Sequence, residues 1–134
     1  MKGKLETAAW GFSSERAENA LDSRNDFVAA LHRHTAPPVD EFVAKLIYTE
    51  LVSNVIRHAP GPIRILLERD GAEHWLHVFD RGAPFEWRPE LPGDPYGEGG
   101  RGLFLISRYS QEVVIERPSA GGNLVRIRLT RPAA

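Results

Sequence analysis

Three polar side chains in the stretch EFVAKLIYTELVSNVIRHA have the types and the spacing that chemistry requires. Glu50, Asn54 and His58 are four residues apart, so a helix would place them on one stripe. The earlier positions of that stripe are Val43 and Ile47, which are apolar. We therefore expect Glu50 and Asn54 to face a cavity, where a carboxylate and an amide suit Mg²⁺ beside phosphates, or a general base. The spacing fits an ordinary solvated helix face equally well.

A second group of such residues ends the apolar run Val78-Phe79-Asp80-Arg81-Gly82. A carboxylate at the end of a strand can accept a hydrogen bond from an exocyclic amine such as that of adenine. Gly82 has no side chain, which would leave room for a flat base. The alternative is that Asp80 only forms a turn or caps a helix, as Asp commonly does at such positions.

The segment GEGGRGLFLIS spells G-x-G-x-x-G with Gly97, Gly99 and Gly102. A dinucleotide-binding turn should follow a strand directly, but the preceding RPELPGDPY is too rich in proline for a central strand. A P-loop is excluded because no Gly-Lys-Ser or Gly-Lys-Thr follows. Glycine N–H groups can still approach phosphates where a helix starts near Gly102, and Arg101 adds a positive charge there. A flexible surface loop is the alternative.

The elements that position these residues follow from apolar periodicity and from Pro and Gly punctuation. Helices come first and hairpins later, which favours an α+β two-layer sandwich with one mixed β-sheet and about three helices on one face. Ser13 or Ser14 would cap the first helix, and Asp70-Gly71 would form a hairpin turn. We expect helices up to residue 34, over 39–59 and over 103–109, and strands over 4–12, 63–69, 75–79, 112–116 and 124–129.

Composition sets further limits. With 134 residues, we expect a single domain over residues 1–134. The formal net charge of −1 gives no bulk attraction to nucleic acid or to a membrane surface. The chain contains no cysteine, which excludes disulfides and thiolate metal sites and fits a reducing compartment. We find neither a signal-peptide pattern nor a membrane-spanning run, and we therefore expect a soluble cytoplasmic protein.

Taken in order, the three groups resemble the N box and the two glycine boxes of the GHKL ATPase superfamily, which has the Bergerat fold. The motifs are Glu50-x-x-x-Asn54, Asp80-x-Gly82 and Gly97-x-Gly99-x-x-Gly102. The run ELVSNVIRHA is similar to the smallest branch of that superfamily, the anti-sigma-factor serine kinases of bacterial partner-switching systems. The resemblance covers residues 5–129 and implies that the nucleotide is ATP, bound with Mg²⁺.

The resemblance implies a role for each matching residue. Glu50 would be the general base, and Asn54 would coordinate Mg²⁺. Asp80 would bind the adenine amine, and Gly82 would make room for the ring. Residues 83–96 would form a mobile lid. The residues that wrap the triphosphate would be Gly97, Gly99, Gly100, Arg101 and Gly102.

Three more residues are candidate contacts to the nucleotide. His58 lies at the helix end nearest the lid, although an exposed last turn that favours positive charge explains it as well. Leu103 follows the last glycine of the loop. Asn123 follows Gly122, at a position where the family often has Thr beside the nucleotide. Asn keeps the capacity for hydrogen bonds but not the shape of Thr, so this departure bears on base or phosphate geometry and on the turnover rate.

The resemblance implies a protein serine kinase that phosphorylates an antagonist protein carrying an acceptor serine. Such a protein would also hold a sigma factor or another regulator and thereby regulate transcription. The presence of Glu50 favours this function over an ATP-binding interaction module, which does not need a base. A histidine-kinase catalytic domain is disfavoured, because no dimerisation helix pair with a phosphoacceptor His precedes the N box. We expect no direct contact with nucleic acid or membrane, and the sequence leaves open whether the chain forms a homodimer.

Overall fold

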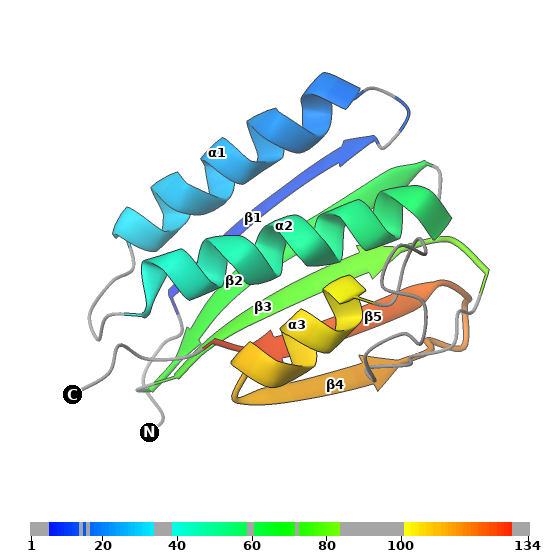
Figure 1. Ribbon diagram of the computed structural model, residues 1–134. Coiled ribbons are helices and arrows are strands. Elements are labelled where there is room, and N and C mark those ends of the chain that lie inside the picture. Colours follow the sequence, from blue (N-terminus) through cyan, green and yellow to red (C-terminus); the bar gives the residue numbers. More distant parts are fainter. Residues whose placement is uncertain are drawn as a thin grey trace.

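The structure is a computed structural model that describes residues 6–13, 15, 17–33, 39–58, 61–71, 73–83 and 101–129. Helices and strands form two layers (Figure 1), as the α+β sandwich expected from the sequence requires. The helices are α1 (Ala17–Arg33), α2 (Glu41–His58) and α3 (Arg101–Tyr109). The strands are β1 (Glu6–Ser13), β2 (Pro62–Asp70), β3 (Glu73–Asp80), β4 (Glu112–Glu116) and β5 (Asn123–Arg128).

The strands form one sheet in the order β1-β2-β3-β5-β4. Every strand pairing in the described part of the chain is antiparallel, so the expectation of a mixed sheet was wrong in this detail. Two helices separate β1 from β2, so the chain returns to the end of the sheet where β1 stops, and β2 runs against β1. One helix separates β3 from β4, and such a connection commonly joins parallel neighbouring strands. Here β5 lies between β3 and β4 and pairs antiparallel with both.

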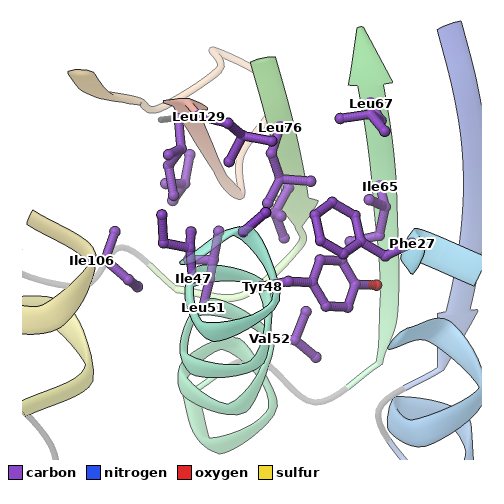
Figure 2. Close-up of a cluster of buried hydrophobic side chains, with 14 of the residues drawn as sticks. Phe27, Ile47, Tyr48, Leu51, Val52, Ile65, Leu67, Leu76, Ile106 and Leu129 are labelled. Carbon is purple, nitrogen blue, oxygen red and sulfur yellow. The ribbon is translucent and has the colours of Figure 1, made fainter. Parts of the chain in front are cut away.

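All three helices cover one face of the sheet (Figure 1). β3 and β5 alternate between buried and half-buried residues, because every second side chain of a strand points toward the helices. Figure 2 shows α2 in the middle of the helical layer, with Phe27 of α1 and Ile106 of α3 on opposite sides. Ile47, Leu51 and Val55 of α2 are at most 1% exposed, as a helix between two others and a sheet requires. No helix in the described residues is long and apolar enough to cross a membrane.

A polar contact inside the core joins β1, α1 and α2. The Tyr48 hydroxyl contacts the Ser23 hydroxyl and donates to the Ser23 carbonyl oxygen at 3.3 Å. Trp10 Nε1 donates to the Tyr48 hydroxyl oxygen at 3.3 Å. The Tyr48 ring stacks on Phe27 with their centroids 4.4 Å apart. Burial raises the pKa of the Tyr48 phenol above its usual range. These contacts fix α2, the helix that carries the polar stripe, against α1 and the first strand.

The helix starts differ from the predicted ones for identifiable reasons. α2 begins after Asp40, whose Oδ1 accepts a hydrogen bond from the Val43 N–H at 3.1 Å, so Asp40 acts as an N-cap that the sequence analysis missed. The predicted cap of the first helix was wrong for Ser13. That residue pairs with β2 as the last residue of β1, and α1 begins only at Ala17. The other candidate, Ser14, lies outside the described residues.

Candidate functional site

The polar stripe of α2 runs into the interior of the protein. Asn54 is 3% exposed and Glu50, one turn earlier, is half-buried. The solvated-face alternative is therefore excluded for Asn54. Among the described residues the Asn54 Nδ2 has no hydrogen-bond partner, and an unsatisfied buried amide costs free energy. A ligand that brings a hydrogen-bonding group to this amide would remove that cost.

The carboxylate of Asp80 occupies the last position of β3. The alternation along β3 directs this side chain to the helix-covered face, where Asp80 is 1% exposed. Its Oδ1 accepts a hydrogen bond from the Gly82 N–H at 2.8 Å, which turns the chain out of the strand. The turn-forming alternative raised for Asp80 is thus correct. It does not exclude a ligand, because this bond uses only one of the two carboxylate oxygens.

The first residue of β5 meets Asp80 directly. Asp80 and Asn123 are paired in the register of β3 and β5, and the Asn123 Nδ2 donates to the Asp80 Oδ1 at 2.9 Å. Gly122 makes this approach feasible, since its φ is 90° and a Cβ there would overlap the carbonyl oxygen of Asp80. Asn123 was predicted as a nucleotide contact, but its bond to Asp80 was not predicted. The signal present in the sequence was the glycine pair immediately before Asn123.

The remaining candidates are described in part. The backbone of His58 closes α2, and the backbones of Arg101, Gly102 and Leu103 open α3, close to the predicted helix start. Their proposed roles stay predictions. The parts that lie outside the described residues are the side chains of His58, Arg101 and Leu103, the loop residues Gly97, Gly99 and Gly100, and the expected lid beyond Ala83.

These groups gather at one end of the sheet. Figure 1 shows the end of β3, the start of β5 and the C-terminal end of α2 at the same side of the molecule. β2 begins shortly after α2 ends, and its Ile63 pairs with Asp80, which brings the last turns of α2 near that carboxylate. The arrangement offers buried hydrogen-bond acceptors, a buried amide and a half-buried carboxylate. Such a set can accept hydrogen bonds from an amine of a polar ligand and can offer an amide to a second polar group of it.

A separate hollow of about 510 Å³ lies across the sheet from these groups. Leu66, His77 and Phe79 line it, and they occupy the strand positions that alternate with the helix-facing ones. The residues that line this hollow do not include Asp80, Asn123 or the polar stripe of α2. The hollow is therefore distinct from the candidate site. Its lining residues are Ala9, Trp10, Gly11, Arg64, Ile65, Leu66, His77, Phe79 and Leu124.

The donor set decides whether Mg²⁺ suits this end of the sheet. Within the described residues, no group of three or more His, Cys, Asp or Glu side chains could hold a metal ion. Mg²⁺ beside phosphates does not need a protein cage, since phosphates, waters and one or two protein oxygens hold it. Asn54 fits the protein's share, because its amide is buried and partly unsatisfied. A half-turn of the amide exchanges its nitrogen and oxygen, so the same position can offer Oδ1 to a metal.

Comparison with known proteins adds an independent finding. The family model described as histidine kinase-like ATPase domain matches residues 13–129. The match begins at the last residue of β1 and ends directly after β5, so it includes the α2 stripe, Asp80 and Asn123. No curated protein matches the chain.

Proposed function

Because the chain belongs to the histidine kinase-like ATPase domain family, a GHKL type of ATPase, we propose that it is an ATP-dependent protein serine kinase of a partner-switching system. Its protein substrate would be an antagonist with an acceptor serine, and it would hold a sigma factor as an anti-sigma factor. ATP binding is what family membership supports, and transfer to serine is our proposal. One observation carries it: a half-buried carboxylate, Glu50, stands one helical turn before the buried, unsatisfied amide of Asn54.

The base of ATP would bind where β3 and β5 meet. The buried Asp80 carboxylate supplies an acceptor for the adenine amine, and Gly82 leaves space beside it. The phosphates would extend toward Asn54 and the start of α3, where N–H groups that lack intrahelical partners favour anions. Asn54 is the described residue that would hold Mg²⁺, which when bound neutralises charge that develops on the phosphates.

Glu50 is the group that would accept the proton of the attacking serine. The serine oxygen forms a bond to the γ-phosphorus, the bond from that phosphorus to the β,γ-bridging oxygen breaks, and ADP leaves. The serine proton passes to the Glu50 carboxylate. The alternative is that Glu50 only forms an ion pair with Arg57 or Arg101 and stabilises the helix. In the described residues no ion pair joins Glu50 to Arg57, and the side chain of Arg101 lies outside them.

The proposal is tested by incubating the chain with ATP, Mg²⁺ and each small protein encoded beside it, followed by intact mass measurement and phosphosite mapping. The wild-type protein is expected to add a phosphoryl group to one serine of a partner. Glu50→Gln keeps the shape of the side chain, so ATP affinity should stay within a few-fold. Transfer should fall by roughly 10²-fold or more, the usual scale for a lost general base. Glu15→Gln, at an exposed position before α1, is the matched control and should transfer at the wild-type rate.

Three outcomes would count against the proposal. A folded, ATP-bound Glu50→Gln protein that transfers at the wild-type rate would remove Glu50 from the chemistry. A phosphohistidine in place of phosphoserine would favour the histidine-kinase alternative. ATP binding without transfer to any partner would favour an interaction module in which the nucleotide only sets the conformation.

A further inference from the structure

The amide of Asn123 is a junction between β5 and the residues that follow β3. Its Nδ2 lies 2.9 Å from the Asp80 Oδ1, 3.0 Å from the Ala83 carbonyl oxygen and 3.5 Å from the Gly82 carbonyl oxygen. An amide nitrogen carries two hydrogens, and the two shorter contacts account for both of them. Asn123 therefore holds a carboxylate oxygen and a loop carbonyl at the same time.

These contacts fix which way the amide points. If the amide were turned over, its oxygen would face the Asp80 carboxylate and a carbonyl, so acceptors would meet acceptors without a hydrogen between them. The orientation with Nδ2 toward Asp80 is thus set by the partners. Oδ1 must then point away from Ala83 and from the bonded carboxylate oxygen.

The Asn123 Oδ1 is a buried acceptor that lacks a partner. The residue is 1% exposed, and no hydrogen bond to Oδ1 exists within the described part of the chain. Leaving a buried acceptor unsatisfied costs free energy, and a ligand that donates a hydrogen bond to the acceptor would remove this cost. An acceptor held rigidly by its own amide nitrogen is also pre-oriented for that donor.

Asp80 has a second carboxylate oxygen, Oδ2. The bonds from Gly82 and from Asn123 both end on the Asp80 Oδ1, and neither uses Oδ2. A ligand that approaches the pair therefore meets acceptors from two side chains that are each 1% exposed. An N–H donor satisfies such a pair, whereas a carbonyl oxygen is repelled by it. A base with an exocyclic amine fits this rule, and a base with an oxo group at the same ring position does not.

We propose that Asn123 is a base-selecting residue, which positions the Asp80 carboxylate through Nδ2 and offers Oδ1 as a second acceptor to the exocyclic amine of the base. This inference rests on the proposed nucleotide function. It assigns the preference for a 6-amino over a 6-oxo purine to two side chains that act together. It also gives Asn123 a role toward the base and not toward the phosphates.

The competing explanation is structural. Asn is a common residue beside glycine turns, and Asn123 follows the pair Gly121-Gly122. In that case the amide would only tie β5 to the residues after β3. Removing it would lower thermal stability and weaken every nucleotide to the same extent. Selectivity among bases is the readout that separates the two explanations.

The test compares three purine riboside triphosphates: ATP with an amine at position 6, inosine triphosphate with an oxo group there and a hydrogen on N1, and purine riboside triphosphate with a hydrogen at position 6. Calorimetric titration measures the affinity of each for the wild type and for Asn123→Ala. The wild type should prefer ATP over purine riboside triphosphate by about 100-fold, since each of two hydrogen bonds adds about tenfold. Inosine triphosphate should bind most weakly. In Asn123→Ala the ATP preference should fall by about tenfold or more.

Asn25→Ala, at an exposed position of α1, is the matched control and should keep the wild-type preference. Asn123→Ser provides a second variant if Asn123→Ala does not fold, because its hydroxyl can still donate to Asp80 while the amide oxygen is gone. It should lose selectivity in the same way. An unchanged ratio between ATP and purine riboside triphosphate in the folded variants would overturn the inference.

The design also separates this inference from the proposed function. If the wild type binds none of the three triphosphates, nucleotide binding itself fails and the inference falls with it. If the wild type binds all three with equal affinity, nucleotide binding stands and base selection by Asn123 is wrong.

Discussion

Replacing Asp80 with Asn removes the charge at the end of β3 and keeps the shape of the side chain. Asp80 is 1% exposed, and its Oδ1 accepts hydrogen bonds from Gly82 and Asn123. The amide oxygen of the variant can accept both bonds, so we expect the fold to persist. The amide nitrogen then replaces the second carboxylate oxygen and turns a donor toward the adenine amine.

The magnitude follows from these contacts. A hydrogen bond to a charged group contributes about 1.5–3 kcal/mol, against about 0.5–1.5 kcal/mol for a neutral pair. The variant loses a charged acceptor for the amine, so ATP binding should weaken by about 1–3 kcal/mol, or roughly 5- to 150-fold in Kd. Two bonds inside the protein weaken as well, but the variant no longer buries a charge. These opposing effects should leave the melting temperature nearly unchanged.

Calorimetric titration with ATP and thermal denaturation of the same samples measure both quantities. Asp70→Asn is the matched control, because Asp70 is exposed at the end of β2, and it should bind ATP like the wild type. An Asp80→Asn protein that is folded and binds ATP with wild-type affinity would refute the assignment of Asp80 to the site.

Four more substitutions test other parts of the account. Asn54→Ala should weaken nucleotide binding far more with Mg²⁺ than with EDTA, and equal losses would leave Asn54 only a structural role. Gly121 and Gly122 have φ values of 102° and 90°, so replacing either with Ala should cost about 1–3 kcal/mol of strain. Gly122→Ala should lower the melting temperature further than Gly121→Ala, because only its Cβ meets the backbone of Asp80. Burial raises the pKa of Tyr48, so the folded protein keeps this proton where the unfolded chain loses it, and stability should fall as the pH rises above about 10. Tyr48→Phe should flatten that fall in urea denaturation curves, and parallel pH profiles would contradict the argument.

The sequence predicted the elements well where a local pattern decides them. The strand Glu112–Glu116 was expected over 112–116, and the Asp70-Gly71 turn has Gly71 at a φ of 63°. Apolar alternation and glycine turns are properties of neighbouring residues, so they can be read without tertiary contacts. The end of β3 was predictable for the same reason, and so Asp80 and Gly82 were found.

Helix starts were harder to predict because two uses compete for the same residue. Ser13 has the side chain of an N-cap, but its backbone pairs with β2 and extends β1 instead. Asp40 fell in the first turn of the helix expected over 39–59, whereas in the structure it precedes α2 and its carboxylate accepts a hydrogen bond from the Val43 N–H. Strand pairing and capping depend on which partner is nearby, and a single sequence does not show that.

The bond between Asp80 and Asn123 could not be predicted, because it joins residues 43 positions apart. It requires β5 to lie beside β3, although β4 comes first along the chain. Antiparallel order and register are set by the packing of the whole sheet, and a shift by one residue would turn Asn123 to the other face. Strand order also depends on contacts between distant strands, so the sequence did not show that every described pairing is antiparallel, and a mixed sheet was predicted.

The central claim is that ATP binds at the end of the sheet where β3, β5 and α2 meet. The most direct measurement is a titration of ¹⁵N-labelled protein with Mg²⁺ and ATP, followed through the side-chain amides of Asn54 and Asn123 and the backbone amide of Gly82. The account predicts that all three resonances shift and saturate together at one equivalent of nucleotide. Saturating ATP that leaves these resonances in place, or that shifts residues of the hollow on the opposite face such as Leu66 and Leu124, would contradict it.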